Sequence, residues 1–315
     1  MTMVVPIEPP TPPAHVTVMP QEVVAALSPA DDQVLLDLTA GGGGHSVAIL
    51  EFCPTVRVIA FDRDPAAVAT TRERLAPYGG RAMVVRAAFD EVGQWLSEHG
   101  VSEVSGLVAD LGVSSMQLED ARRGMSFRLE GPLDMRMDQQ SGEAACELIE
   151  RVSQDELADL IYRFGEERRS RRVARCIKQA LADGRLSTTI DLRRAVVRAV
   201  GPRRVGGVDP ATRTFQALRI AVNGELGQLG ALLELSVNVV RPGGTAAFIS
   251  FHSLEDRMVK RALSDRATWQ RLSTKPVLAS DTERAKNPRA RSAKLRAARR
   301  VAPSGQTHAS RGEVI

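Results

Sequence analysis

Short apolar segments alternate with amphipathic segments through the first third of the chain. Apolar runs short enough to be buried strands occur at 33–38, 57–62, 82–86 and 104–111. The segments between them, at 45–52, 65–75 and 90–99, have the periodicity of helices. Strands and helices that alternate at such short intervals are typical of a parallel sheet with crossover helices. The pattern therefore predicts an α/β fold with a Rossmann-like core.

This alternation stops after residue 111 and resumes near residue 213. Between these points, amphipathic stretches at 155–164, 166–182 and 187–200 predict helices, and almost no run resembles a strand. Farther along, we expect one long helix at 215–240, a strand at 245–251, a helix at 254–263 and a final edge strand at 294–301. The predicted organisation is a core formed by 15–115 and 213–315, a helical insertion at 116–212 and a disordered leader at 1–14.

Composition places the chain among ordinary globular proteins. Of its 315 residues, 43% are hydrophobic, and no apolar run approaches the roughly 20 residues that a membrane span needs. The proline-rich leader has neither the basic nor the apolar region of a signal peptide. Cys53, Cys146 and Cys176 are far apart, which matches neither a disulfide framework nor a zinc site. We therefore expect a cytoplasmic protein that does not associate with membranes.

Positive charge is concentrated well beyond what the net charge of +4 indicates. The basic residues gather in 163–178, in 193–204, which includes Arg203 and Arg204, and in 284–300, which contains no acid. Each cluster alone is equally compatible with a solvated helix face. Three clusters together favour a polyanionic partner, and nucleic acid is the first candidate.

A run of glycines follows the first predicted strand, which ends at Asp37. Gly41 to Gly44 lie between that strand and a helix, where backbone amides can approach a ligand. The dinucleotide fingerprint fails because Ser46 stands where its third glycine belongs. An acid four residues ahead of Gly-x-Gly is instead the form found in methyltransferases. There the acid, here Asp37, would lie near the ammonium group of an amino-acid ligand.

Two further acids end predicted strands on the same edge of the sheet. Asp62 lies roughly 20 residues past the glycines, where a carboxylate can accept both ribose hydroxyls of a nucleoside. Asp110 ends the fourth strand. Three acids at one carboxyl edge suit a cofactor with a sulfonium group, and S-adenosylmethionine is such a cofactor. His45 begins the first helix and is expected to contact it, whereas the five histidines are too scattered for a metal site.

Long motifs along the chain carry a resemblance to a known family. They are 15–18, 43–46, 61–65, 110–118, 131–138, 165–168, 210–217, 249–257 and 287–292. In this order and over about 15–300, the chain resembles the bacterial MraW (RsmH) family. The resemblance implies a class I, Rossmann-like, S-adenosylmethionine-dependent methyltransferase with an inserted helical domain that helps to hold RNA. Its implied reaction is methylation of the exocyclic N4 of a cytidine in the decoding region of 16S ribosomal RNA.

The resemblance also implies a set of cofactor contacts. They are Gly43, Gly44, His45, Asp62, Phe89, Asp110 and Gln117. Departures from the family pattern are small: Ala40 replaces a bulkier residue, Arg169 a frequent aromatic and Asp209 a frequent histidine. The implied partner is 16S ribosomal RNA within the small ribosomal subunit, and the oligomeric state does not follow from the sequence.

The implied reaction requires help at the acceptor nitrogen. The N4 lone pair is delocalised into the cytosine ring, so the enzyme must orient the amino group and accept a hydrogen bond from it. Asp110 is the expected acceptor, and Ser114, Ser115 and Asn223 are lesser candidates. The segment 250–253 is either a wall of the base pocket or a turn that caps the helix after it.

Three rival functions share parts of this pattern. A nicotinamide oxidoreductase would have the same fold, but the third glycine and a hydride-transfer constellation are missing. A non-catalytic RNA-binding protein on this scaffold would have no need of Asp62 and Asp110. A DNA cytosine-N4 methyltransferase typically has Ser/Asp-Pro-Pro-Tyr after the fourth strand, where this chain has Asp110-Leu111-Gly112-Val113. Methyl transfer to another nucleic acid stays an alternative.

Overall fold

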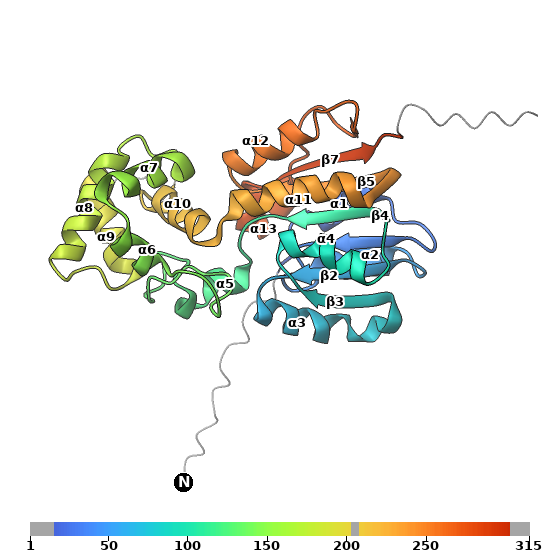
Figure 1. Ribbon diagram of the computed structural model, residues 1–315, viewed down its shortest axis with the longest axis horizontal. Coiled ribbons are helices and arrows are strands. Elements are labelled where there is room, and N and C mark those ends of the chain that lie inside the picture. The colour runs from blue at the N-terminus through green and yellow to red at the C-terminus, as the bar shows by residue number, and fades with distance from the viewer. Residues whose placement is uncertain (1–15, 203–207, 303–315) are drawn as a thin grey trace, which may run out of the picture.

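A single seven-stranded sheet forms the centre of the computed structural model, which describes residues 16–202 and 208–302. The leader, Arg203 and Arg204 lie outside the described residues. The strands are β1 (Val34–Asp37), β2 (Arg57–Asp62), β3 (Ala82–Arg86), β4 (Val104–Asp110), β5 (Val240–Ser250), β6 (Trp269–Arg271) and β7 (Lys294–Arg300). Their order is β3-β2-β1-β4-β5-β7-β6 (Figure 1). β1 to β5 are parallel, and β7 is antiparallel to both β5 and β6.

Helices cover both faces of the sheet because alternate strand residues point to opposite sides. In β4, Val108 belongs to a core with α1 and α2, whereas Leu107 belongs to a core with α4, α11 and α12. The core helices are α1 (Pro20–Leu27), α2 (Gly44–Phe52), α3 (Pro65–Leu75), α4 (Phe89–Glu98), α11 (Glu225–Val239), α12 (Ser253–Ala262) and α13 (Asp281–Lys286). The predicted α/β core is therefore confirmed.

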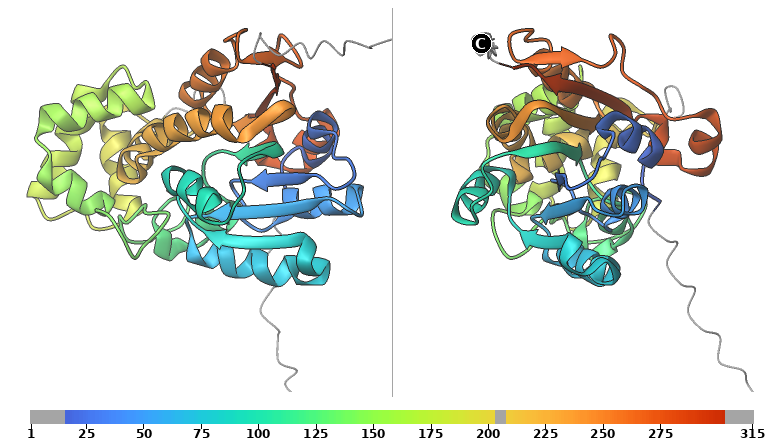
Figure 2. Two further views of the ribbon diagram at one scale, coloured as in Figure 1. Left: turned by 45° about the vertical axis from the view of Figure 1, so that its right-hand side comes forward. Right: turned by 90° about the vertical axis from the view of Figure 1, so that its right-hand side faces the viewer.

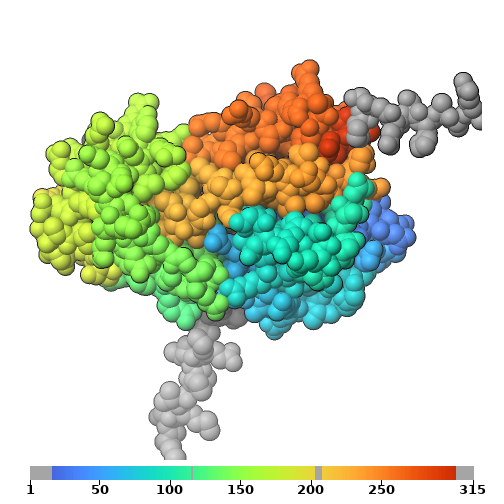
Figure 3. Space-filling model, in the orientation of Figure 1, coloured from blue at the N-terminus to red at the C-terminus, as the bar shows by residue number. Residues whose placement is uncertain are grey.

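A second group of helices extends from one end of the sheet (Figures 1 and 2). It contains α5 (Ser115–Glu119), α6 (Ala145–Arg151), α7 (Gln154–Gly165), α8 (Ser170–Ala182), α9 (Thr189–Val200) and α10 (Thr212–Asn223), and is called the helical unit below. The unit has a hydrophobic core of its own, to which Ile161, Val173, Leu192 and Leu218 contribute. In Figure 3 it forms one end of the molecule.

The predicted helix at 215–240 is wrong because Gly224 divides it. Gly224 has φ 60°, a left-handed conformation that glycine adopts without steric cost, and it ends α10 before α11 begins. Side chains of α10, such as Phe215 and Leu218, pack into the core of the helical unit. The apolar periodicity continues across the break, so the pattern alone did not reveal it.

Two other predictions of elements need correction. The helix expected at 166–182 begins at Ser170, since Glu166 with φ 51° ends α7 in a left-handed conformation. The final strand is not an edge strand, because β7 lies between β5 and β6. The edge strand β6 has only three residues, too few to show a pattern.

Candidate active site

A cavity lies at the carboxyl ends of the parallel strands, where the core meets the start of the helical unit. Six residues expected to contact the cofactor line it, namely Gly44, His45, Asp62, Phe89, Asp110 and Gln117. Gly43 is not among the lining residues; it is the N-cap of α2, with φ 76°. The residues that the sequence motifs singled out are thus brought together by the fold at one place.

The glycine turn between β1 and α2 approaches a neighbouring segment too closely for any side chain at Gly44. A Cβ atom built there would lie 1.6 Å from the Oγ1 of Thr17 and 2.8 Å from its Cβ. Thr17 itself lines the cavity. Glycine at this position therefore lets the segment before α1 close one side of the site.

Asp62 ends β2 and connects the glycine turn to the next strand. Its Oδ2 accepts a hydrogen bond from the N–H of Gly41 at 2.8 Å, and its Oδ1 accepts one from the N–H of Asp64 at 2.9 Å. Burial raises the pKa of Asp62 to about 6, although these two backbone hydrogen bonds oppose the shift. At neutral pH the carboxylate is ionised, and two of its lone-pair positions remain for the hydroxyls of a ribose.

His45 and Asp110 face each other across the cavity floor. The Nε2 of His45 lies 3.6 Å from the Oδ2 of Asp110, and both residues are largely buried. Burial opposes protonation of the imidazole, but the adjacent carboxylate of Asp110 and then the charge of Asp37 raise the pKa of His45 above its usual value. Within the described part of the chain, the Oδ1 of Asp110 and both ring nitrogens of His45 are buried without a hydrogen-bond partner.

Asp37 is not among the residues that line the cavity, although we expected it near the ammonium group of the ligand. It is fully buried, and its Oδ2 accepts a hydrogen bond from the Ser46 hydroxyl at 2.7 Å. Its Oδ1 accepts from the N–H of Thr39 at 3.2 Å. Burial raises the pKa of Asp37. The side chain joins the end of β1 to the first turn of α2 and thereby fixes the glycine turn.

Gln117 organises the rim of the cavity as well as lining it. Its Oε1 accepts a hydrogen bond from the N–H of Ser114, the N-cap of α5, at 3.0 Å. Its Nε2 donates to the Oδ2 of Asp64 at 2.9 Å. Asp64 lies two residues beyond Asp62, so the entrance to the helical unit is hydrogen-bonded to the strand end that holds that carboxylate.

The sequence did not predict four polar residues that line the cavity on the side opposite Asp62. They are Glu225, Gln228, Glu255 and Arg289. The motifs 249–257 and 287–292 contain two of them, but no spacing assigned them a place. The Nη2 of Arg289 donates to the carbonyl oxygen of Val113, and its guanidinium lies 5.6 Å from the centre of the Phe251 ring. Burial lowers the pKa of Arg289.

Asn223, a lesser candidate for the acceptor role, serves the loop structure instead. Its Oδ1 accepts a hydrogen bond from the N–H of Met137, and its Nδ2 donates to the carbonyl oxygen of Met135, both at 2.8 Å. It is buried and does not line the cavity. Ser114, in contrast, does line it.

The expected cofactor fits the groups that the cavity presents. Asp62 supplies a buried carboxylate, Phe89 and Leu111 supply apolar surface, and the turn at Gly41 supplies closely approachable backbone. The Oδ1 of Asp110 has no hydrogen-bond partner among the described residues and suits a polar ligand, because buried polar atoms are normally hydrogen-bonded. A nucleoside that carries an amino-acid group and a sulfonium centre meets these requirements.

Comparison with known proteins identifies the family. The model of the MraW methylase family matches residues 13–301. The chain belongs to the MraW methylase family. It is 64% identical over 298 residues to a relative from Sorangium cellulosum named ribosomal RNA small subunit methyltransferase H, with 93% of this chain and 94% of the relative covered.

Other relatives extend the same agreement across the MraW methylase family. Relatives of the same name from Prochlorococcus marinus and Methylobacterium nodulans are 51% and 46% identical, with 91% and 92% of this chain and 93% and 91% of the relatives covered. A crystal structure of an rRNA methylase from Streptococcus thermophilus covers 90% of this chain, and this chain covers 94% of it, at 10% identity and a TM-score of 0.42. The strand order with a reversed β7 is that of class I, Rossmann-like methyltransferases, and S-adenosylmethionine is their methyl donor.

The basic clusters of this MraW-family chain have different surroundings. Arg171, Arg172 and Arg175 are exposed on α8. In the second cluster, Arg193 is paired with Asp209 at 2.9 Å. In the third, Arg296 is paired with Asp256 at 2.7 Å. The helix α8 therefore presents a group of exposed basic residues, and Lys286 and Arg291 of the third cluster are exposed as well.

Proposed function

We propose that this chain transfers a methyl group from S-adenosylmethionine to the exocyclic N4 of a cytidine in the decoding region of 16S ribosomal RNA. The observation that carries the proposal is the partly unpartnered carboxylate of Asp110, which ends β4 in the same cavity as Asp62. The relatives' name supports ribosomal RNA of the small subunit as the substrate. The same name supports action in the cytoplasm, where ribosomal subunits are assembled.

The chain's own residues divide the work between the two ends of the cavity. Asp62 accepts hydrogen bonds from the ribose hydroxyls, and Phe89 contacts the adenine. His45 and the turn at Gly43 and Gly44 hold the amino-acid end. When bound, the cofactor supplies an electrophilic methyl group on a positively charged sulfur.

Asp110 acts on the acceptor nitrogen. Its Oδ1 accepts a hydrogen bond from N4, which withdraws the lone pair from conjugation and aligns it with the methyl–sulfur bond. No strong base has to act first, because the N–H becomes acidic as nitrogen gains the methyl group. The target cytidine must leave its stack to reach this depth.

The helical unit is proposed to hold the RNA. Its helix α8 lies at the outer end of the helical unit, away from the sheet (Figures 1 and 3). On this helix Arg171, Arg172 and Arg175 are exposed to solvent. Contacts of arginine with phosphate release counterions, so subunit binding by this surface weakens steeply with added salt.

Among the described residues, no helix is long and apolar enough to cross a membrane.

Labelled methyl transfer tests the proposal. Small ribosomal subunits from a strain that lacks this gene are incubated with the protein and S-adenosylmethionine, and the nucleosides are analysed by mass spectrometry. We expect N4-methylated cytidine at one site, with transfer RNA and DNA as acceptors that stay unlabelled. Label on transfer RNA or DNA alone would assign the other nucleic acid. Tight cofactor binding with no transfer to any acceptor would favour a non-catalytic RNA-binding protein.

A further inference from the structure

Glu255 lies in the cavity on the side opposite Asp62 and has no role in the steps above. It is 3% exposed and belongs to the first turn of α12, directly after β5. Its Oε2 accepts hydrogen bonds from the N–H groups of Phe251 at 2.9 Å and His252 at 3.3 Å. Its Oε1 lies 3.1 Å from the Nε2 of His252. These contacts fix the carboxylate at the end of β5, next to the end of β4.

Gly112 lies near Glu255, just after the end of β4. It follows Asp110 by two residues and has φ 90°, which favours glycine. A Cβ atom built at Gly112 would lie 3.9 Å from the Oε1 of Glu255, 3.8 Å from the Phe251 ring and 4.0 Å from the guanidinium of Arg219. Two carboxylates from neighbouring strand ends therefore flank one glycine on the wall of a single cavity.

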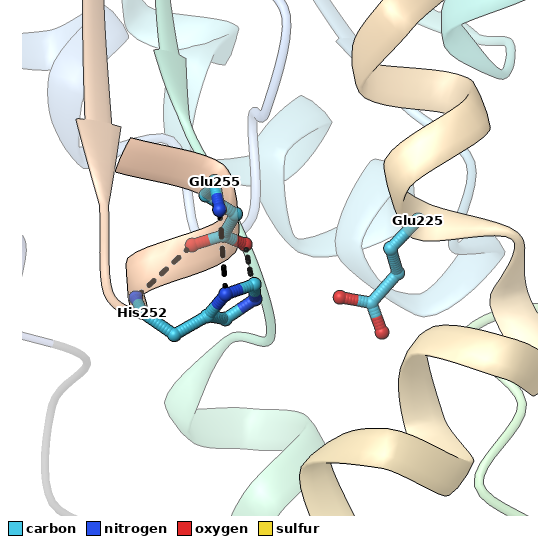
Figure 4. A group of neighbouring side chains, drawn as sticks. All are labelled: Glu225, His252 and Glu255. Carbon is cyan, nitrogen blue, oxygen red and sulfur yellow. Dashed lines mark hydrogen bonds and ion pairs between the residues drawn. The ribbon is translucent and has the colours of Figure 1, made fainter. Parts of the chain in front are cut away.

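A second carboxylate and a histidine lie near Glu255, and such a group of side chains can bind a metal ion. Ligand atoms of Glu225, His252 and Glu255 lie within 4.8 Å of one another, with Glu225 reaching in from a different helix (Figure 4). Arg219, however, occupies both oxygens of Glu225, with two hydrogen bonds of 2.8 Å. This guanidinium opposes the binding of a divalent cation, so the group does not fit a metal centre.

The same neighbours keep Glu255 charged. Burial raises its pKa, but the hydrogen bond and charge of His252, followed by the charge of Arg219, lower the pKa below its usual value overall. An ionised carboxylate in a buried cavity is a strong hydrogen-bond acceptor. Its Oε1 is the oxygen that faces Gly112, which also lines the cavity.

We propose that Glu255 is the second acceptor for the target amino group, so that Asp110 receives one N–H of cytidine N4 and Glu255 receives the other. This inference rests on the proposed function. Two acceptors are required to hold both N–H groups while the lone pair turns toward the methyl group. As the N4–methyl bond forms, the methyl–sulfur bond breaks and its electron pair goes to sulfur. The positive charge then on N4 is removed when one N–H proton passes to Glu255 and from there to solvent.

A purely structural role for Glu255 makes a different prediction. As the third residue of α12, it completes a capping box with His252. Glu147 has the same role in α6, where its Oε2 accepts a hydrogen bond from the N–H of Ala144 at 2.7 Å, away from the cavity. Glu147→Gln is therefore a matched control for Glu255→Gln, since both variants keep an oxygen that can cap and lose only the charge.

The experiment measures single-turnover methylation of small ribosomal subunits together with calorimetric binding of S-adenosylmethionine. We expect Glu255→Gln to bind the cofactor like the wild type and to lower the methylation rate by roughly 10²-fold or more, the scale of a lost proton acceptor. Glu147→Gln keeps the wild-type rate. If Glu255→Gln methylates at a rate within about threefold of the wild type, the loss is too small for a missing proton acceptor, and the proposal is overturned.

A second variant covers the case in which Glu255→Gln does not fold. Glu255→Asp keeps the charge, and Asp191 shows in α9 that aspartate can complete a capping box. It withdraws the carboxylate from Gly112, so we expect normal cofactor binding and a rate reduced by roughly 10-fold or more. An unchanged rate for Glu255→Asp also contradicts the proposal. Absence of methylation by the wild-type protein contradicts the proposed function itself, which keeps the two failures distinguishable.

Discussion

Arg123 places its Nη2 within 2.9 Å of both carboxylate oxygens of Asp64. Arg123 belongs to the short turn after α5, whereas Asp64 caps α3 in the core. Both residues are buried, and the Nη1 of Arg123 also donates to the carbonyl oxygen of Met137 at 2.8 Å. This ion pair is a buried charged connection between the strand end at Asp62 and the segment that enters the helical unit.

Replacing Arg123 by methionine is expected to lower the free energy of unfolding by about 3 kcal/mol, because the buried carboxylate of Asp64 loses its charged partner. Urea denaturation measures the change. Arg122→Met is the control: Arg122 is 87% exposed and paired only with Asp120 in its own turn, so its unfolding midpoint stays at the wild-type value. Equal midpoints for the two variants would show that the buried pair has no net role.

Because of the close approach at Gly44, two glycine-to-alanine changes are expected to differ: one lowers cofactor affinity, and the other only raises stability. Gly44→Ala places a methyl group onto Thr17 and displaces a wall of the cavity, so cofactor affinity should fall by at least about tenfold. Gly230→Ala, in the middle of α11, meets nothing within 4 Å and should stabilise the protein by about 0.5 kcal/mol without altering affinity. Calorimetry with S-adenosylmethionine and thermal unfolding check both variants. Wild-type affinity in Gly44→Ala would contradict the proposed contact of Thr17 with the site.

Asp110→Asn separates the charge of this residue from its shape. The methylation rate should fall by roughly 10²-fold or more, because the acceptor for N4 loses its charge. The pKa of His45, which Asp110 raises, should fall in the same variant. Nuclear magnetic resonance of labelled histidine reports the second effect without any substrate. A variant with an unshifted His45 pKa and normal turnover would remove Asp110 from both roles.

The pKa of Asp62 makes stability depend on pH. Burial raises this pKa from 3.8 to about 6, so between these values the folded protein binds a proton that the unfolded chain has lost. The free energy of unfolding therefore decreases as pH rises through this window, by up to about 3 kcal/mol. Asp62→Asn removes this contribution and also weakens cofactor binding. Urea titrations from about pH 4 to 7 give the slope of the free energy of unfolding against pH for the wild type and for Asp62→Asn. Identical slopes for the two proteins would contradict the assignment to Asp62.

The exposed arginines of α8 predict a salt effect. Arg171→Ala with Arg175→Ala should weaken binding to small subunits and reduce the slope of log affinity against log salt by about 1.5, which corresponds to two lost phosphate contacts. Arg57→Ala with Arg241→Ala removes equal charge from the amino ends of β2 and β5, where both residues are exposed. This double variant should leave the slope unchanged. Equal slopes for the two double variants would exclude α8 from the interface.

The core was predictable from sequence because its inner strands bury both faces. The run that became β2 has the expected bounds, and its residues 58–61 are buried, as in a parallel sheet covered on both sides. Elements whose order depends on distant partners were not predictable. β6 is three residues long and pairs only with β7, and nothing local indicates that it forms the edge.

The cofactor side of the cavity was predictable for a related reason. Asp62 and Asp110 end strands, and the ends of parallel strands meet at one edge. Asp37 ends a strand as well, but its side chain turns toward Ser46, and such an orientation depends on packing that the sequence does not display. Glu255 and Arg289 reach the cavity from elements more than a hundred residues beyond β4, so only the fold reveals them.

The position of β7 has a consequence for the order in which the protein forms during synthesis. β5 has β7 as one of its two neighbours, so one side of it stays unpaired until residues 294–300 have left the ribosome. Arg289, which reaches the cavity just before β7, arrives equally late. The helical unit has its own core and can collapse earlier from local contacts. A nascent chain can therefore form the helical unit before the cavity is closed, and a chain truncated before β7 would leave one edge of β5 unpaired and prone to aggregation.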